Sequence, residues 1–390
     1  GGRYPTNTRL ESGCHMNADT ALGPIREDAD HGTEETVYDV AVIGAGPAGT
    51  QAAISAAHQM RHVLVLDAGE VSQRKGRAYW SKSVEIQDAP VFAGVTGPEL
   101  IKALRQWMAA HPVREITIAG EKRLTGIEVR GGMVLELVRK GDLFELVTSV
   151  ERLREGKPLV IRRFLARAVV VASGFEDKWP DIEVDESAQR LFEKYRVVFR
   201  YAGNARGWHV CIRCDGHLHV DQHLAIVGVG DYVYGTALGA QDFTNKITIL
   251  TNGRPHGMSP SVLRQIQERG IEIIETKIKR HIGKGTDLLG LELEDGRELF
   301  FDGFLVDEGL EPNTQFLKGW DVQTDEEGLL VVDEDGQVLD ANGDPVPGLF
   351  AAGDIVAGTR NLIATAFALG QNAGLSASDS LRKWRWPKEE

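Results

Sequence analysis

The chain has 390 residues, which is too long for one compact core and suits two domains of ordinary size. Hydrophobic residues make up 42% and charged residues 26%, a balance typical of soluble globular proteins, and no apolar run is long enough to cross a bilayer. The net charge of −13 argues against general nucleic-acid binding, which needs a basic surface. We therefore expect a cytoplasmic protein whose partners are neither nucleic acids nor membranes.

The leader, residues 1–35, differs in character from the rest of the chain. It is polar and contains glycine, and the sequence before His15-Met16 resembles the remnant of an expression vector, with the native start near Met16. We expect residues 1–35 to be disordered and to lie outside the fold. Cys14 falls in this leader, and the chain's other two cysteines are Cys211 and Cys214, so there is no disulfide framework of a secreted domain.

A dinucleotide-binding unit is predicted at the start of the folded part. Apolar runs predict strands over 40–43 and 63–66, and an Ala-rich stretch predicts a helix over 50–58 between them. The second strand ends at Asp67, where an acid can bind a ribose hydroxyl. The alternative is a glycine turn that holds no ligand.

Three glycines in the first turn carry the prediction. Gly44 permits the tight turn, Gly46 lets the backbone approach a pyrophosphate, and Gly49 allows the helix to pack closely on the strand. The N-terminus of the following helix then presents free N–H groups and a positive dipole end to the phosphates. This motif is specific because strand, turn, helix, strand and acid occur in order.

The middle of the chain contains a helix, three strands and an irregular segment. The pattern predicts a helix near 99–110, antiparallel strands over 133–138 and 143–150, and a buried strand over 168–172. Residues 175–208 are mixed and charged, and we interpret them as a crossing between domains that carries an insertion.

A second unit of the same kind is predicted over 224–250, with weaker signals. Gly228 and Gly230 form its turn, but Val233 stands where the third glycine belongs and would push the helix away from the strand. The alternative is a nucleotide fold that has lost its usual nucleotide.

The loop after the second unit's last strand also departs from a nucleotide site. Residues 251–253 offer no acid for an NAD ribose, and Arg254 is the only arginine near enough to bind a 2′-phosphate. Tyr232 and Tyr234 crowd the glycine motif.

The segment 211–216 reads Cys-Ile-Arg-Cys-Asp-Gly. Thiols at this spacing can close a small disulfide ring, and Arg213 together with a helix N-terminus would favour a thiolate. Asp215 is placed to pass a proton to a leaving thiolate. These features favour a redox pair formed by Cys211 and Cys214.

Two other interpretations of this segment stay open. One is a pair of inert buried cysteines. The other is a metal site, because His217 and His219 complete the pattern Cys-x-x-Cys-x-x-His-x-His. We favour redox chemistry and expect no metal.

The C-terminal part predicts a strand near Leu349, a Gly353-Asp354 turn and an Ala-rich helix over 361–381. A Gly-Asp turn alone is a weak signal.

Taken in order, these motifs resemble the low-molecular-weight thioredoxin reductase family from about Tyr38 to Leu381. The matching segments are 42–49 (Val-Ile-Gly-Ala-Gly-Pro-Ala-Gly), 172–174 (Ala-Ser-Gly), 211–216, 309–314 (Gly-Leu-Glu-Pro-Asn-Thr), 347–354 (Pro-Gly-Leu-Phe-Ala-Ala-Gly-Asp) and 360–362 (Arg-Asn-Leu).

The resemblance implies an α/β fold of two Rossmann-like, three-layer domains, the second inserted into the first. The FAD domain would comprise residues 36–173 and 306–390, and the module like an NADPH domain, which carries the cysteines, residues 174–305. It also implies a homodimer that acts on a thioredoxin-like protein or a small disulfide.

The resemblance further assigns roles to residues. Cys214 would face the flavin, Cys211 would exchange with the substrate disulfide, and Asp215 would act as acid and base. Thr365 would begin a helix aimed at the flavin ring. The residues expected to bind FAD are Gly44, Gly46, Pro47, Ala48, Gly49, Asp67, Ala68, Arg77, Gly353, Asp354, Arg360, Asn361 and Leu362. Those that would hold a second nucleotide or flavin are Gly228, Gly230, Tyr232 and Tyr234.

Several departures from the family speak against NADPH. The family's Gly-Gly-Gln is replaced by residues 76–78, and its basic His-Arg-Arg by residues 251–253. Asp88 stands where an Asn is expected, and the tail adds Trp384 and Trp386. The chain is more similar to the pyridine-nucleotide-independent branch, in which ferredoxin or a second FAD supplies electrons.

We therefore expect an FAD-dependent dithiol/disulfide oxidoreductase with one FAD per chain, or two in the diflavin case. The alternatives are an NADPH-dependent thioredoxin reductase, a dithiol oxidase that uses oxygen, and a flavin-bound redox sensor without enzymatic activity.

Overall fold

The computed structural model describes residues 24–28, 36–72, 75–152, 157–183 and 196–382. Within them the chain forms two compact units. The first comprises residues up to 76, 101–175 and those from 312 onward, and the second comprises 77–100 and 176–311. The expected domain limits at 174 and 305 lie near these crossings, and the structure adds residues 77–100 to the second unit. The predicted α/β class with two parallel-stranded units is confirmed.

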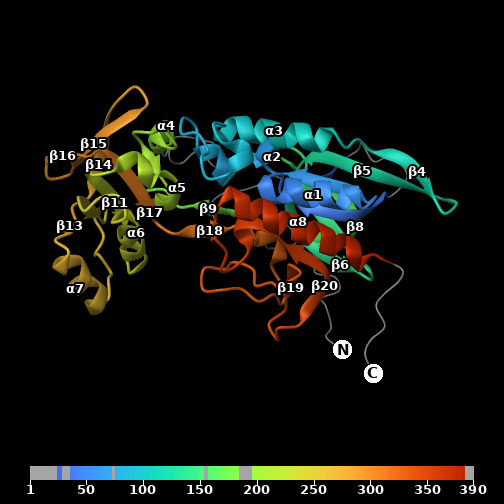
Figure 1. Ribbon diagram of the computed structural model, residues 1–390. Helices are drawn as coiled ribbons and strands as arrows, with labels where there is room; N and C mark the ends of the chain where they lie inside the picture. Colours follow the sequence, from blue (N-terminus) through green and yellow to red (C-terminus); the bar gives the residue numbers. More distant parts are fainter. Residues whose placement is uncertain (1–23, 29–35, 73–74, 153–156, 184–195, 383–390) are drawn as a thin grey trace. The chain divides into compact units, whose positions relative to one another are not determined.

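The first unit is built on a parallel sheet (Figure 1). Its parallel strands, in order across the sheet, are β20 (Pro345–Ala351), β8 (Leu159–Val171), β2 (Val37–Ile43), β3 (His62–Asp67) and β5 (Glu121–Gly131). The antiparallel strands β19 (Gln337–Leu339) and β4 (Arg114–Ile118) close its edges. The strands β2 and β3 are almost wholly buried, as expected for strands covered on both faces.

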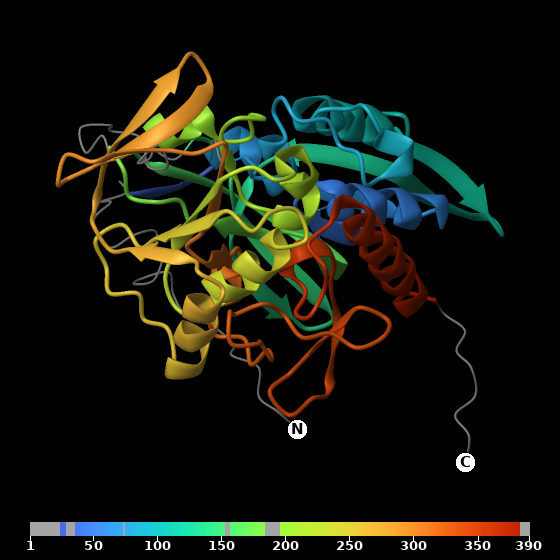
Figure 2. The same cartoon turned by 60° about the vertical axis from the view of Figure 1, so that its left-hand side comes forward.

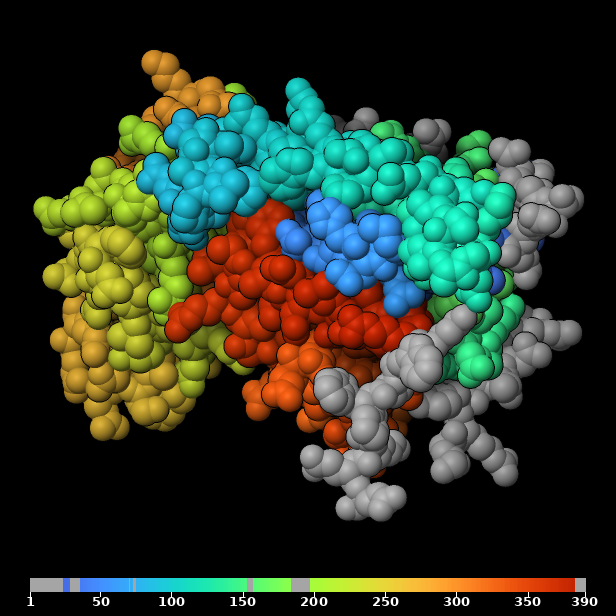
Figure 3. Space-filling view, turned by 45° about the vertical axis from the view of Figure 1, so that its right-hand side comes forward, coloured from blue at the N-terminus to red at the C-terminus, as the bar shows by residue number. Residues whose placement is uncertain are grey.

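Two helices cover one face of this sheet. They are α1 (Pro47–His58) and α8 (Ile363–Ser380), and Figure 3 shows them side by side in blue and red. Small residues permit the close approach, since a Cβ added at Gly370 would lie 2.2 Å from the Ala48 carbonyl oxygen. Their inner faces share one apolar cluster with Val40, Val63 and Val170 of the sheet.

The first unit also contains the hairpin β6 (Met133–Lys140) and β7 (Leu143–Ser149), whose second strand pairs antiparallel with β8. The helix α3 (Gly97–Ala109) begins in the second unit and continues in the first. The shorter elements of the first unit are α2 (Gly69–Ser72), η4 (Gln315–Leu317) and η5 (Gly353–Ile355).

The short strand β1 (Ile25–Glu27) corrects the expectation that everything before residue 36 lies outside the fold. It pairs in parallel with Leu159–Ile161, and Asp28 forms an ion pair with Arg162. So short a strand has no periodicity to detect, and its structure is decided by a partner strand far along the chain. The rest of the leader, Cys14 included, lies outside the described residues.

The second unit contains another parallel sheet (Figure 2). Its strands, in order, are β10 (Trp208–His209), β17 (Gly303–Asp307), β11 (Leu224–Gly228), β12 (Ile247–Leu250) and β13 (Glu272–Ile274). The helix α6 (Tyr232–Ala240) follows β11, and α7 (Pro260–Glu268) follows β12. The predicted strands over 224–227 and 247–250 are confirmed.

An antiparallel sheet completes the second unit. It consists of β14 (Ile278–Lys284), β15 (Asp287–Leu293) and β16 (Glu298–Phe300). The remaining elements of the second unit are η1 (Arg77–Trp80), η2 (Pro90–Phe92), α4 (Arg196–Tyr201), α5 (Ile212–Asp215) and η3 (Gly216–His219). The paired strands β9 (Phe175–Asp177) and β18 (Leu310–Pro312) contain the positions at which the chain passes from one unit to the other. Within the described parts of both units, no helix is both long and apolar enough to span a membrane.

Candidate active site

The first glycine turn joins β2 to α1 with the geometry that a dinucleotide requires. Gly44 has a positive φ of 110°, which favours glycine, and an added Cβ would lie 2.3 Å from the Ala172 carbonyl oxygen. A Cβ at Gly49 would lie 1.9 Å from the Gly44 carbonyl oxygen, so α1 packs directly on the turn. A Cβ at Gly46 would meet nothing within 4 Å, which leaves open space beside the helix N-terminus.

The N-terminus of α1 is suited to a phosphate group. Gly46 is the N-cap and provides no side chain to bind the first N–H groups, and Pro47 occupies the first turn. These N–H groups and the helix dipole can therefore stabilise a pyrophosphate.

Asp67 stands at the end of β3, where an acid that binds a ribose was predicted. Its Oδ1 accepts a hydrogen bond from the Gly69 N–H at 2.9 Å, and its Oδ2 lies 3.1 Å from Nη2 of Arg105. The half-exposed Arg105 can turn aside, because an ion pair of this kind contributes little to stability. Ala68 follows directly and its carbonyl oxygen accepts hydrogen bonds in α2.

The Gly353-Asp354 turn is brought to the same place. Gly353 has φ 80°, and an added Cβ would lie 2.7 Å from the Cβ of Ala48 on α1. Two segments from opposite ends of the folded chain thus meet at one helix N-terminus. The residues Arg360, Asn361 and Leu362 come just before α8, which begins at Ile363. Thr365 is therefore the third residue of that helix and not its first.

The residues present fit an FAD. The open position at Gly46 and the uncapped N-terminus of α1 match a pyrophosphate, and the carboxylate of Asp67 matches a ribose. When bound, FAD would supply the site with a two-electron carrier.

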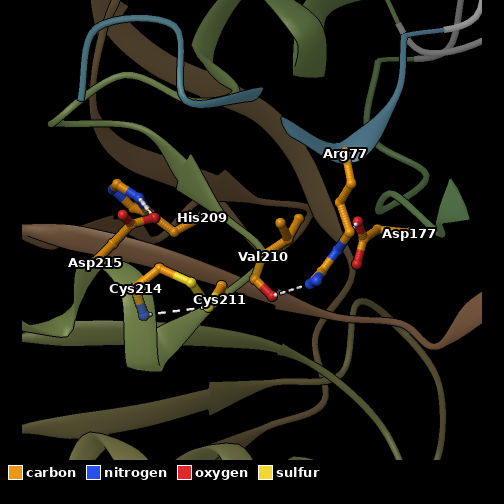
Figure 4. Close-up of a disulfide and its surroundings, with 7 residues drawn as sticks. All are labelled: Arg77, Asp177, His209, Val210, Cys211, Cys214 and Asp215. Atoms are coloured by element: carbon orange, nitrogen blue, oxygen red, sulfur yellow. Dashed lines mark hydrogen bonds and ion pairs between the residues drawn. A yellow bond between two sulfur atoms is a disulfide. The ribbon is translucent and has the colours of Figure 1, made fainter. Parts of the chain in front are cut away.

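The second unit carries the cysteine pair (Figure 4). Cys211 and Cys214 form a disulfide, with their Cα atoms 5.3 Å apart. Cys211 precedes the short helix α5, and its Sγ accepts a hydrogen bond from the Cys214 N–H at 3.1 Å. Both residues are half-buried, and Arg213 between them is exposed.

A buried histidine holds the predicted acid–base residue. Nδ1 of His209 lies 2.8 Å from Oδ2 of Asp215, and the histidine side chain is 1% exposed. Figure 4 shows this pair beside the disulfide. His219 stacks edge-on against His209, with ring centroids 5.2 Å apart. The sequence reasoning missed His209 altogether.

Arg77 belongs to the second unit, and the structure does not group it with the first glycine turn. Its Nε donates to Oδ2 of Asp177 at 2.8 Å, and its Nη2 donates to the Val210 carbonyl oxygen at 3.1 Å. It therefore binds the backbone next to Cys211 (Figure 4).

The second glycine turn accommodates the valine that was expected to push its helix away. Val233 is fully buried, and its Cγ2 would lie 2.8 Å from a Cβ at Gly228. Beside it the Asp307 carboxyl accepts a hydrogen bond from Thr236 at 2.8 Å, and burial raises the pKa of Asp307. The absence of a side chain at Gly228 makes room for Val233.

The loop after β12 is folded onto this second turn. Arg254 donates through Nε to the Thr251 carbonyl oxygen at 3.1 Å, and its Nη2 lies 2.5 Å from Oε1 of Glu308. The Gly230 N–H, a group that a pyrophosphate could use, donates to the His256 carbonyl oxygen at 2.7 Å.

The tyrosines near this turn have different environments. Tyr232 is 65% exposed, whereas the Tyr234 hydroxyl contacts Gln265 and the Arg269 guanidinium lies 5.7 Å from its ring. Tyr234 thus packs on α7.

Trp80 stacks on Phe199 at 5.0 Å and contacts Trp179 edge-on, within the apolar cluster of the second unit. Trp384 and Trp386 lie outside the described residues.

Three of the four side chains that a metal would need, those of Cys211, Cys214 and His219, contact other groups of the protein. The sulfurs of Cys211 and Cys214 are bonded to each other, and His219 contacts Gln222 and His209. Among the residues that the structure describes, no group of three metal-ligating side chains is assembled.

The sequence profile of the pyridine nucleotide-disulphide oxidoreductases matches residues 38–373. The chain belongs to this family. It is an oxidoreductase and a flavoprotein of the thioredoxin-reductase-like type, as the resemblance implied.

Individual relatives agree with the family. The thioredoxin reductase of Listeria monocytogenes serovar 1/2a is 26% identical over 353 residues, which cover 88% of this chain and 94% of that protein. The thioredoxin reductase of Aquifex aeolicus is 28% identical over 359 residues, covering 89% and 94%. The crystal structure of thioredoxin reductase from Streptococcus pyogenes MGAS5005 has the same fold, with a TM-score of 0.68 at 22% identity over 89% of this chain and 99% of that one.

Proposed function

We propose that this oxidoreductase exchanges electrons between FAD and the Cys211–Cys214 disulfide and does not use NADPH efficiently. The cysteine dithiol would exchange with a thioredoxin-like protein, the partner suggested by the relatives' names, or with a small disulfide. Ferredoxin or a second FAD would provide the electrons, and the active molecule would be a homodimer.

The observation that carries the proposal against NADPH is the pairing of Arg254 with Glu308. Arg254 is the candidate for a 2′-phosphate, but its guanidinium is 2.5 Å from a carboxylate that is only 8% exposed. If Arg254 turned to a phosphate, it would leave this carboxylate buried without its cation, which is costly.

The shape of the loop supports the same proposal. Asn252 and Gly253 both have positive φ, of 53° and 83°. Oδ1 of Asn252 accepts a hydrogen bond from the Ile278 N–H at 2.9 Å, and its Nδ2 donates to the Asp181 carbonyl oxygen. Residues 252 and 253 thus serve the turn itself, and basic side chains there would strain it.

The expected loss of affinity is large. A charge-assisted hydrogen bond contributes about 1.5–3 kcal/mol, so the absence of two weakens NADPH binding roughly a hundredfold or more. A second cation near the loop, Lys277, has its ammonium 3.8 Å from Glu294.

The test is anaerobic reduction of the bound flavin, followed by its absorbance. Reduced ferredoxin, NADPH and NADH are added in turn, and dithionite shows that the flavin can be reduced. We expect little reduction by NADPH, and we expect Glu308→Gln, which releases Arg254, to improve it. Lys277→Ala is the matched control and should leave the rate unchanged. Fast reduction of the wild type by micromolar NADPH would refute the proposal and favour an NADPH-dependent thioredoxin reductase.

Three further measurements complete the proposal. Flavin released by denaturation is counted per chain: about two supports a diflavin enzyme, and about one supports a single FAD with an external donor. Oxygen consumption with a small dithiol tests the alternative of a dithiol oxidase. A protein that reduces no disulfide and consumes no oxygen would favour the alternative of a redox sensor without enzymatic activity. Light scattering after size exclusion tests the homodimer.

A further inference from the structure

A line of polar side chains leads from the disulfide into the second unit. Asp215 contacts His209, and Nε2 of His209 lies 3.4 Å from Nε2 of His219. Nδ1 of His219 in turn lies 2.9 Å from Oε1 of Gln222. Both histidines are buried, at 3% and 4% exposure, so the middle of the line is screened from water, whereas Asp215 and Gln222 at its ends are half-buried.

Hydrogen-bond chemistry fixes one end of this line and leaves the rest free. A carboxylate only accepts, so this contact needs a hydrogen on Nδ1 of His209, and it is this hydrogen that can pass to Asp215. The opposite nitrogen, Nε2, has two neighbours. One is the Ala205 carbonyl oxygen at 3.3 Å, which can only accept a hydrogen bond, and the other is Nε2 of His219. With hydrogens on both nitrogens the His209 ring is a cation that donates to Asp215 and to Ala205. When the Nδ1 hydrogen passes to Asp215, the neutral ring keeps the Nε2 hydrogen that faces Ala205.

The rest of the line can follow either state. His219 donates from Nδ1 to Oε1 of Gln222 in both states, and its Nε2 faces the Nε2 hydrogen of His209. The line therefore holds one proton more or less while both rings stay in place.

The geometry assigns the extra proton to His209, because that ring contacts the Asp215 carboxylate whereas the hydrogen-bond contacts of His219 are with Gln222 and His209. Burial lowers the pKa of His219, so His219 stays neutral. The strand β17 presents Leu305 opposite His209, which brings no charge. The charged or titratable groups near the line, from all neighbouring elements, are Asp215 and the exposed Arg213 on α5, the exposed His217 and the buried His219 on η3, Asp302 before β17, and the pair Arg77–Asp177 at Val210.

We infer that His209 is a positioning residue that orients the Asp215 carboxylate and stores the proton that Asp215 passes to and from the cysteine pair. This inference rests on the proposed exchange of the cysteine pair with a disulfide. It goes further by assigning the proton to a residue outside the Cys-x-x-Cys-Asp segment.

The exchange can be written with every proton placed. In the reduced protein, one cysteine is a thiolate, the other is a thiol, and His209 is protonated. The thiolate attacks a substrate sulfur, the substrate S–S bond breaks, and the leaving sulfur takes the His209 proton through Asp215. The remaining thiol then gives its proton to the Asp215–His209 pair and attacks the mixed disulfide. The second leaving sulfur takes that proton, so two electrons and two protons have moved to the substrate.

Two substitutions of His209 distinguish the orientation of the Asp215 carboxylate from the storage of the proton. His209→Asn keeps a donor near the position of Nδ1 but cannot take up a proton, and His209→Phe keeps a ring but removes both abilities. The exposed His217→Asn is the matched control in the same segment. Bound FAD and the unfolding midpoint show whether each variant is folded.

The first readout is the rate at which the reduced protein, prepared with dithionite, reduces a small disulfide across pH 5 to 9. We expect the rate of the wild type to fall toward the alkaline end of this range, where the stored proton is no longer available. His209→Asn should lack this fall in rate and should be roughly tenfold slower than the wild type. His209→Phe should be slower still, by a factor of about 10² or more, the lower end of the range for acid–base catalysis.

The second readout is alkylation of the reduced cysteines by iodoacetamide across the same pH range, which needs no donor and no partner. Loss of the His209 charge should leave about threefold fewer thiolates near neutral pH in His209→Asn. If wild type and His209→Asn share one pH profile in both readouts, the inference is overturned. If the wild type reduces no disulfide, the proposed function fails, and the alkylation profile still decides the role of His209.

Discussion

The contrast between Gly46 and Gly49 provides a sharp test of the flavin site. Both are glycines of one turn, but the structure gives them different tasks. At Gly49 an added methyl group would lie 1.9 Å from the Gly44 carbonyl oxygen, whereas at Gly46 it would meet nothing within 4 Å. Gly49→Ala should therefore damage the fold, and Gly46→Ala should damage only flavin binding.

The magnitudes follow from these distances. In Gly49→Ala the helix must withdraw until the contact lengthens from 1.9 Å to the 3.0 Å below which real Cβ contacts are essentially never seen. Because the obstacle is backbone and α1 is also packed on α8, we expect a cost of about 3 kcal/mol, at the upper end for overpacked cores. Gly46 is extended, with φ −76°, which alanine adopts freely, so the cost there is about 1 kcal/mol or less.

The assay measures both properties for each variant. Urea unfolding of the flavin-free protein gives the free energy of unfolding, and titration with FAD gives the affinity. Gly46→Ala should unfold nearly as the wild type does and bind FAD at least tenfold more weakly, a loss of about 1.4 kcal/mol. A stable Gly49→Ala protein would refute the packing argument, and a Gly46→Ala protein with unchanged FAD affinity would refute the placement of the pyrophosphate at this turn.

Three other expectations concern the second unit. Cys211→Ser should leave Cys214 able to perturb the flavin absorbance spectrum, and Cys214→Ser should abolish that effect; identical spectra would contradict the assigned roles. Metal analysis of the purified protein should find no stoichiometric zinc, and zinc with no titratable dithiol would reverse the redox interpretation. Burial raises the pKa of Asp307, so folding loses stability as pH rises from the ordinary value of 3.8 through the raised one. Asp307→Asn should therefore raise the urea midpoint at pH 7.5 but not at pH 4, and an equal change at both would exclude a buried charge as the cause.

The sequence predicts best the elements whose signals are local. The strand β2, the glycine turn and α1 follow from apolar runs and glycine spacing, because backbone sterics near Gly44 and Gly49 act within a short stretch of chain. The helix bounds needed correction, since α1 begins at Pro47 and not at the expected residue 50. Local rules also located the pair Cys211–Cys214, which bond as predicted.

The features that sequence reasoning missed depend on partners far along the chain. The strand β17 contains a short apolar run that becomes a strand between β10 and β11. The role of Arg254 depends on Glu308, which lies in a later loop of the chain. His209 has no local signal either, because a lone histidine before Cys211 gains its meaning only when α5 turns Asp215 back toward it.

The order of the strands in the first sheet also determines which unit can be completed first during synthesis. β8 lies between β2 and β20, and both β20 and η5 come from the C-terminal part of the chain. Gly353 meets Ala48 only after that segment has left the ribosome, whereas most of the second unit is translated earlier as one continuous stretch. A ribosome that stalls before Pro345 would therefore release a chain that carries the cysteine pair but lacks β20 and the segment that contacts Ala48.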